Sequence, residues 1–143
     1  MTASLAAGRR SAGVVVVRRS GGEWRCLMLR AYRNWDFPKG VIERDEAPLA
    51  AALRETLEET GLARMDLRWG DDYIETARYA RDKVARYYLA ESAKGVVYLP
   101  VNPVLGRPEH HEFRWASFIE AARIAPPRLQ PVVEWAVAKV SRG

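Results

Sequence analysis

Three glutamates lie close together near the middle of the chain, at Glu55, Glu58 and Glu59. In a helix, residues three and four apart share one side, so this spacing brings the three carboxylates within a single turn. They repel one another unless a cation lies between them, and only Arg54 is near enough along the helix to offset the repulsion. Hard divalent ions prefer carboxylate oxygen, so the pattern predicts a site for Mg²⁺, with Mn²⁺ as a substitute.

The glutamates belong to a longer pattern, which argues against an ordinary solvated acidic face. The pattern G-x5-E-x7-R-E-x-x-E-E-x-G-L spans residues 40–62 and directly follows Pro38-Lys39. It resembles the Nudix box, the signature of hydrolases that cleave a nucleoside diphosphate linked to another group. One position departs from the box, because Thr56 stands where the family usually has an aliphatic residue. We interpret this departure as a variation in packing.

The resemblance implies a role for each matching residue. Glu55 and Glu59 are expected to bind the metal, and the carbonyl of Gly40 to complete its coordination. Glu58 is expected to be a further ligand or the base that orients water, and Arg54 to orient a box carboxylate. Members of the family use different carboxylates as the general base, so Glu55 and Glu58 both remain catalytic candidates.

One helix must position the carboxylates. Ala, Leu, Arg and Glu are good helix formers, so a helix is expected at residues 47–60. Pro48 suits its first turn, and Gly61 can take the left-handed conformation that ends a helix. The inward side of the helix is expected to consist of leucines four residues apart and a neighbouring alanine: Leu49, Leu53, Leu57 and Ala50.

The rest of the chain indicates a sheet with further helices. Apolar and β-branched runs predict strands, of which the first two form a hairpin, at residues 11–19, 23–31, 65–69, 73–81, 83–91, 96–99 and 112–116. Helices are expected at residues 118–124 and 128–140. This order predicts an α/β fold, a Nudix-type α/β/α sandwich with a central mixed β-sheet.

The 143 residues, 48% of them hydrophobic and 29% charged, suit one globular domain. We expect this domain at residues 11–143, after a flexible N-terminus at residues 1–10. No apolar run has the length of a membrane span and the N-terminus does not match a secretory signal, which favours the cytoplasm. Cys26 is the single cysteine, so no internal disulfide can form. The net charge of +5 suits a polyanionic substrate.

A second resemblance concerns the substrate. The segment 109–115, together with WDFPKG and RYYLAE, is similar to sequences of the diadenosine polyphosphate hydrolase branch of the Nudix family. It implies that Glu109 is an extra carboxylate that supports metal binding. It implies that His110 contacts phosphate or acts as an acid, and that Tyr87 stacks on adenine. The branch usually has a histidine where this chain has Val41.

Two basic residues before the box are candidates for substrate binding. Lys39 is expected beside the carboxylates, where an ammonium group can bind a phosphate. Arg33 belongs to a predicted loop, where it either contacts phosphate or base or is simply solvated.

These patterns predict an Mg²⁺-dependent pyrophosphohydrolase that cleaves a dinucleoside tetraphosphate to ATP and AMP. Hydrolysis of the pyrophosphate at an RNA 5′ end is one alternative, and the net charge of +5 would suit backbone contacts there. Hydrolysis of nucleoside triphosphates is a third possibility. A non-catalytic nucleotide-binding sensor is the alternative of a different class, although the intact glutamates argue against it. The sequence leaves open whether the chain is a monomer or a homodimer.

Overall fold

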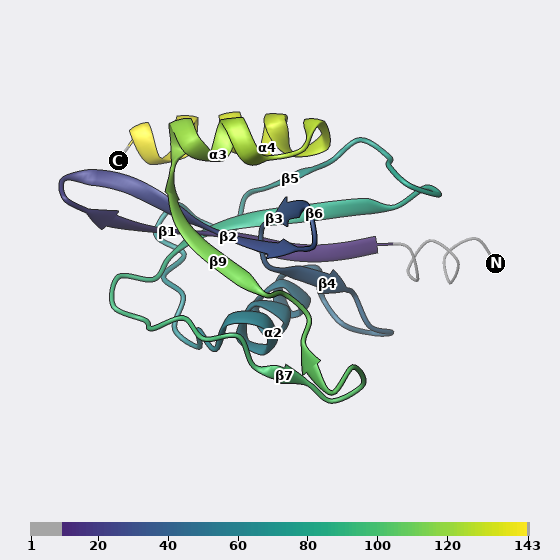
Figure 1. Ribbon diagram of the computed structural model, residues 1–143. Coiled ribbons are helices and arrows are strands. Elements are labelled where there is room, and N and C mark those ends of the chain that lie inside the picture. The colour runs from purple at the N-terminus through teal and green to yellow at the C-terminus, as the bar shows by residue number, and fades with distance from the viewer. Residues whose placement is uncertain (1–9, 143) are drawn as a thin grey trace.

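The computed structural model describes residues 10–142. Their strands and helices are arranged around one sheet (Figure 1). In chain order they are β1 (Arg10–Ser20), β2 (Glu23–Ala31), β3 (Asn34–Asp36), β4 (Lys39–Val41), α2 (Pro48–Thr60), β5 (Tyr73–Glu75), β6 (Val84–Glu91), β7 (Val101–Asn102), β8 (Arg107–Pro108), β9 (Glu112–Ser117), α3 (Phe118–Ile124), the 3₁₀ helix η1 (Pro127–Leu129) and α4 (Gln130–Ser141).

The sheet is mixed, as predicted. Its strands lie in the order β3-β2-β1-β6-β5, and β4 pairs with β1 while β9 pairs with β2. The central strand β1 runs parallel to β6 and antiparallel to both β2 and β4. The predicted hairpin of β1 and β2 is therefore confirmed, and β4 joins the sheet directly before the glutamate helix.

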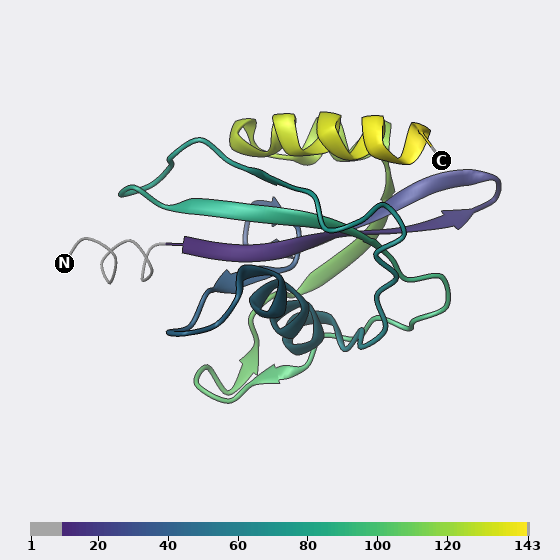
Figure 2. The same cartoon turned by 180° about the vertical axis from the view of Figure 1, so that it is seen from behind.

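Helices cover both faces of the sheet, which confirms the predicted sandwich. In Figures 1 and 2, α3 and α4 lie on one face and α2 on the other. Successive side chains of a strand point to opposite faces, so β1 contributes to two cores. Val15 and Val17 belong to the core under α3 and α4, whereas Val14 and Val16 belong to the core under α2.

The helix α2 has the predicted ends but a different buried side. Gly61 ends it in the left-handed conformation, with a φ of 76°. Its fully buried residues are Ala51, Ala52, Thr56 and Thr60, whereas the predicted inward residue Leu57 is 46% exposed. Small side chains let the helix lie close to the sheet, whose β-branched residues already fill the space between them. The predicted inward side is therefore wrong for Leu57 and for Ala50, which is also exposed.

Several predicted strands are shorter than expected or missing. Residues 65–69 contribute only the bridge between Asp66 and Glu91. The strand predicted at 73–81 ends at Glu75, and left-handed backbone conformations occur further on, at residues 80–82. A two-residue strand, Val101–Asn102, replaces the one expected at 96–99. Apolar composition alone did not distinguish a paired strand from a covering loop in these segments.

The first described residue, Arg10, lies within the segment predicted to be a flexible N-terminus. Arg10 already belongs to β1, while the rest of the predicted flexible N-terminus, residues 1–9, lies outside the described residues. None of the helices in residues 10–142 has the length and apolar character needed to cross a membrane.

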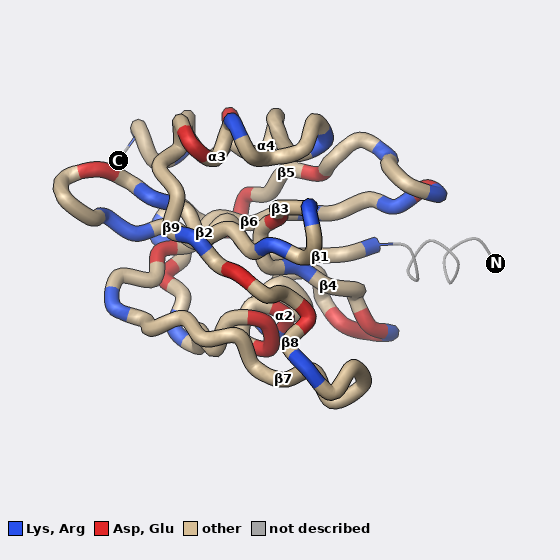
Figure 3. Tube along the Cα trace, in the orientation of Figure 1, with Lys and Arg blue, Asp and Glu red and all other residues tan. Residues whose placement is uncertain are grey.

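Figure 3 shows acidic residues gathered on α2 and the loop before it, with basic residues along β1 and β2. Cys26 is buried, and this burial raises the pKa of its thiol to about 12.

Candidate active site

The first half of the site is the contact between α2 and the backbone of β4. A side chain at Gly40 would overlap the carboxyl group of Glu55, because the two lie in direct contact. Only glycine, which has no Cβ, allows a carboxylate to come this close to the strand. The structure therefore brings together Gly40 and Glu55, which were both predicted to face a metal.

Arg54 holds the acidic residues around it in place. Its Nε donates to Glu46 at 2.8 Å, and its Nη1 donates to Glu55 at 2.8 Å and to Glu58 at 3.2 Å. The hydrogen bonds from Arg54 lower the pKa of Glu46 to about 2. Glu46 also accepts from the backbone N–H of Glu43 at 3.0 Å. Arg54 therefore links Glu46 in the loop before α2 to Glu55 and Glu58 on the helix.

Glu59 is the most buried of the box glutamates, with 8% of its surface exposed. One of its carboxylate oxygens accepts a hydrogen bond from the backbone N–H of Lys39 at 3.2 Å. Burial, together with the nearby charges of Glu109 and Glu55, raises the pKa of Glu59 to about 9. Burial also raises the pKa of Glu55. A bound cation would relieve this repulsion, so the donor set suits a divalent metal.

Two further predicted residues, Glu109 and His110, follow β8 in the chain and lie beside Glu59. Ligand atoms of Glu59, Glu109 and His110 lie within 4.8 Å of one another. Fifty positions separate Glu59 from Glu109, and the sheet and its connections bring them together. Burial is the main factor that lowers the pKa of His110, which favours a neutral imidazole. This cluster therefore contains one predicted metal ligand, Glu59, the predicted supporting carboxylate Glu109, and His110, which was predicted to contact phosphate or act as an acid.

Lys39 lies at the edge of this cluster. Its Nζ is 3.6 Å from Asp36 Oδ2. Burial alone would lower the pKa of Lys39, but the neighbouring Asp36, Tyr79 and Glu59 outweigh it and the pKa is raised. The ammonium group therefore stays charged near the carboxylates. Arg128 also reaches Asp36, at 2.9 Å, and was missed in the sequence because it lies 92 positions away.

Tyr87 does not occupy a substrate-binding position. Its side chain is fully buried in the core under α3 and α4, and its hydroxyl donates to Asp36 Oδ1 at 2.7 Å. A ring without exposed surface offers no face to a base, so stacking on adenine is not available to Tyr87. The alternation of a strand explains the error, because Tyr88, and not Tyr87, faces the α2 side. Arg33 is exposed in the turn between β2 and β3.

The carboxylates line two cavities. A cavity of about 370 Å³ is lined by basic and polar residues that include Lys39, Lys83 and Tyr79. A cavity of about 500 Å³ is lined by more apolar residues, among them Tyr98 and Leu99. Both cavities share a set of mostly acidic lining residues: Glu55, Glu58, Glu59, Asn102 and Glu109. The carboxylates therefore form part of the wall of both cavities.

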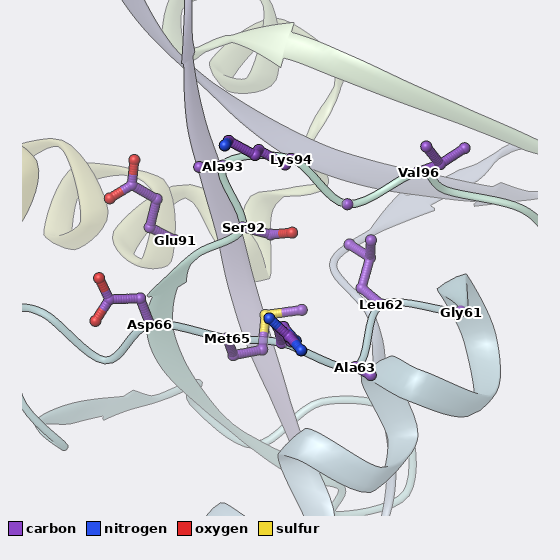
Figure 4. Close-up of a pocket in the computed structure, with 12 residues that line it drawn as sticks. Gly61, Leu62, Ala63, Met65, Asp66, Glu91, Ser92, Ala93, Lys94 and Val96 are labelled. Atoms are coloured by element: carbon purple, nitrogen blue, oxygen red, sulfur yellow. The ribbon is translucent and has the colours of Figure 1, made fainter.

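A further cavity of about 700 Å³ lies at the C-terminal end of α2. Figure 4 shows that the segments 61–66 and 91–96 form its sides. Its charged residues are mixed in sign, with Arg64 and Lys94 beside Asp66 and Glu91. Its lining contains none of the residues predicted to act in catalysis.

Comparisons with known proteins identify the family. The family model described as NUDIX domain matches residues 8–136. An asymmetrical bis(5′-nucleosyl)-tetraphosphatase of Caenorhabditis elegans is 30% identical over 122 residues, which cover 81% of this chain and 84% of that protein. An RNA pyrophosphohydrolase of Bartonella henselae is 40% identical over 79 residues, but these cover 50% of this chain and only 42% of that protein.

Solved structures share the fold. A crystal structure of a C. elegans Ap4A hydrolase binary complex superposes with a TM-score of 0.77 at 22% identity, covering 94% of this chain and 98% of that one. The NUDIX domain of Shewanella oneidensis NrtR complexed with ADP ribose has a TM-score of 0.69 at 15% identity, over 92% and 87% of the two chains. At these identities the two structures support the sandwich architecture alone.

Proposed function

The chain belongs to the NUDIX family and is a hydrolase of that family, and from this premise we propose that it cleaves a dinucleoside tetraphosphate asymmetrically to ATP and AMP with the help of Mg²⁺. The observation that carries the proposal is that the same carboxylates line two cavities. A substrate with a nucleoside at each end needs space on both sides of the bond that is cleaved. The similarity to asymmetrical tetraphosphatases over most of both chains supports this choice.

The residues that would hold the metal are Glu55, Glu59, Glu109 and the carbonyl of Gly40. When bound, a divalent metal supplies polarisation of phosphoryl oxygens and makes water more acidic. The contact of Gly40 with Glu55 and the clustering of Glu59 with Glu109 support this assignment. The donors are carboxylate and carbonyl oxygens, which are the ligands that hard cations such as Mg²⁺ prefer.

The other residues of the site act on substrate and water. Glu58, whose side chain is 56% exposed, lines both cavities, and its carboxylate would accept a proton from the attacking water. Arg54 keeps Glu55 and Glu58 oriented through its two hydrogen bonds. Lys39 places a positive charge where the phosphate chain would lie, which offsets charge that develops in the transition state. We assign the aromatic contact with a base to Tyr98, which is 58% exposed at the more apolar cavity.

Substitution of the box glutamates tests the catalytic assignment. Glu58→Gln and Glu59→Gln keep the side-chain shape but remove the negative charge, so each should lower kcat by about 10²–10⁴-fold at saturating Mg²⁺. Glu134→Gln, in an exposed position on α4, is the matched control and should keep kcat. Wild-type kcat in either box variant would contradict the assignment.

Hydrolysis at an RNA 5′ end is the second candidate, favoured by the similarity to the Bartonella enzyme and by the net charge of +5. Contacts with an RNA backbone release counterions, so the binding constant should fall with salt by a log–log slope of about −0.7 for each phosphate contacted. The measurement is KM for a triphosphorylated RNA oligomer and for diadenosine tetraphosphate at several salt concentrations. An equal salt response for an RNA lengthened by several nucleotides would count against RNA as the substrate.

A further inference from the structure

His110 has an unusual environment among the residues described. The residue is 9% exposed, and its Nδ1 is buried without a hydrogen-bond partner in residues 10–142. Buried polar atoms in folded proteins are almost always paired, and an exception calls for a partner such as a water molecule or an ion. The imidazole therefore has capacity for an interaction that the protein atoms do not supply.

The neighbours of His110 indicate which kind of partner this is. A ring nitrogen of His110 and one carboxylate oxygen each from Glu59 and Glu109 lie within 4.8 Å of one another. Ligand atoms on opposite sides of a bound transition metal are about 4.2 Å apart, twice a bond length of about 2.1 Å. Small side-chain rotations would therefore let all three atoms contact one ion.

A phosphate contact explains this environment less well. An anionic phosphate needs a hydrogen-bond donor, and a ring nitrogen of His110 lies in a cluster whose other members, Glu59 and Glu109, are acids. Two carboxylates would repel the phosphate, whereas Nδ1 has no hydrogen-bond partner among residues 10–142. A ring nitrogen with a lone pair, close to two carboxylates, instead matches a shared cation, to which all three groups are attracted.

We propose that His110 is a nitrogen ligand of the divalent metal, together with Glu59 and Glu109, and that it biases the site from Mg²⁺ toward Mn²⁺. The inference rests on the proposed metal-dependent hydrolysis and deepens it. Mg²⁺ strongly prefers oxygen ligands, whereas imidazole suits transition metals. One nitrogen among carboxylate oxygens therefore changes which metal binds best and leaves the reaction class unchanged.

Pulsed electron paramagnetic resonance tests the ligand directly. Mn²⁺ alone is added to the metal-free full-length protein, without nucleotide, so that any nitrogen coupling comes from the protein. We expect ¹⁴N modulation typical of a coordinated imidazole in the wild type and in His111→Asn, and its loss in His110→Asn. His111 is the matched control because it is adjacent in sequence but exposed. Bound Mn²⁺ without ¹⁴N modulation in the wild type would overturn the proposal, whatever the variants do.

Calorimetric titration gives an independent readout. His110→Asn should weaken Mn²⁺ binding by about tenfold or more, while Mg²⁺ binding changes by less than about twofold. Equal losses for the two metals would contradict a selective nitrogen ligand. If metal-dependent hydrolysis persists while the wild type shows no ¹⁴N coupling, only the role of His110 fails. If neither metal binds or supports hydrolysis, the proposed function fails as well.

Discussion

At the scale of single residues, Asp36 connects the core to the site. Its carboxylate accepts hydrogen bonds from the hydroxyl of Tyr87 at 2.7 Å and from Arg128 at 2.9 Å, and it lies 3.6 Å from the ammonium of Lys39. A buried carboxylate requires such partners. Through Asp36, the buried Tyr87 therefore helps to hold Lys39 in position, and its ring does not contact a base.

Replacement of Tyr87 distinguishes a structural role, the hydrogen bond to Asp36, from a role in stacking on adenine. Tyr87→Phe removes one hydrogen bond from buried Asp36, so it should lower the free energy of unfolding by about 1–3 kcal/mol. The preference for adenine over guanine substrates should stay the same, because the ring has no exposed face. Urea denaturation measures the first quantity and kcat/KM for the two substrates the second. Loss of base preference at unchanged stability would restore the stacking role.

Glu59 should make the stability of the metal-free protein depend on pH. Its folded-state pKa of about 9 exceeds the ordinary value of 4.5, so between these values the folded chain holds a proton that the unfolded chain has lost. The unfolded state binds fewer protons there, and stability falls as pH rises. His110, whose pKa lies below 6.5, acts in the opposite direction only at lower pH.

The measurement is thermal unfolding of the metal-free protein between pH values of about 7 and 9, above the titration of histidine. We expect Tm to fall across this interval. Glu59→Gln should flatten the dependence, because glutamine has no proton to lose, and bound Mg²⁺ should do the same by favouring the carboxylate. A Tm that rises with pH in the metal-free wild type would contradict the placement of Glu59 beside other acids.

At the scale of elements, the site depends on how closely α2 lies against β4. Gly40→Ala would push the Glu55 carboxylate away, because the new methyl group would occupy the same space. We expect a fall in kcat of at least about tenfold while the protein stays folded, since a displaced catalytic group is costly even at small distances. Val41→Ala, in an exposed position on the same strand, is the control. Unchanged kcat in Gly40→Ala would mean that Glu55 has no role in turnover.

The ends of α2 were predictable from sequence, but its buried side was not. Pro48 and Gly61 act through local backbone geometry, which sequence shows directly. The buried side depends on the sheet beneath it, where small residues such as Ala52 and Thr56 fit closely and Leu57 does not. Thr56 donates its hydroxyl hydrogen bond to the carbonyl of Ala52 at 2.8 Å, which satisfies it within the helix. This fits the interpretation of Thr56 as a packing variation.

At the scale of the whole molecule, the sheet gathers residues that the sequence keeps far apart. The box motif predicted the glutamates because they lie on one helix, and a second motif predicted Glu109 and His110. Asp36 and Arg128 carried no local signal for their pairing, since the docking of the C-terminal region on the sheet creates it. The motif predicted a role for Tyr87 but could not decide which face of the sheet this residue occupies.

The proposed substrate is itself a property of the whole molecule, because it would occupy both cavities beside the carboxylates. The most direct measurement is product analysis of one panel with Mg²⁺: diadenosine tetraphosphate, a 5′-triphosphorylated RNA oligomer, and free nucleoside triphosphates. We expect diadenosine tetraphosphate to have the highest kcat/KM and to yield ATP and AMP. A higher kcat/KM for the RNA or a free triphosphate, or symmetrical cleavage to two ADP, would contradict it.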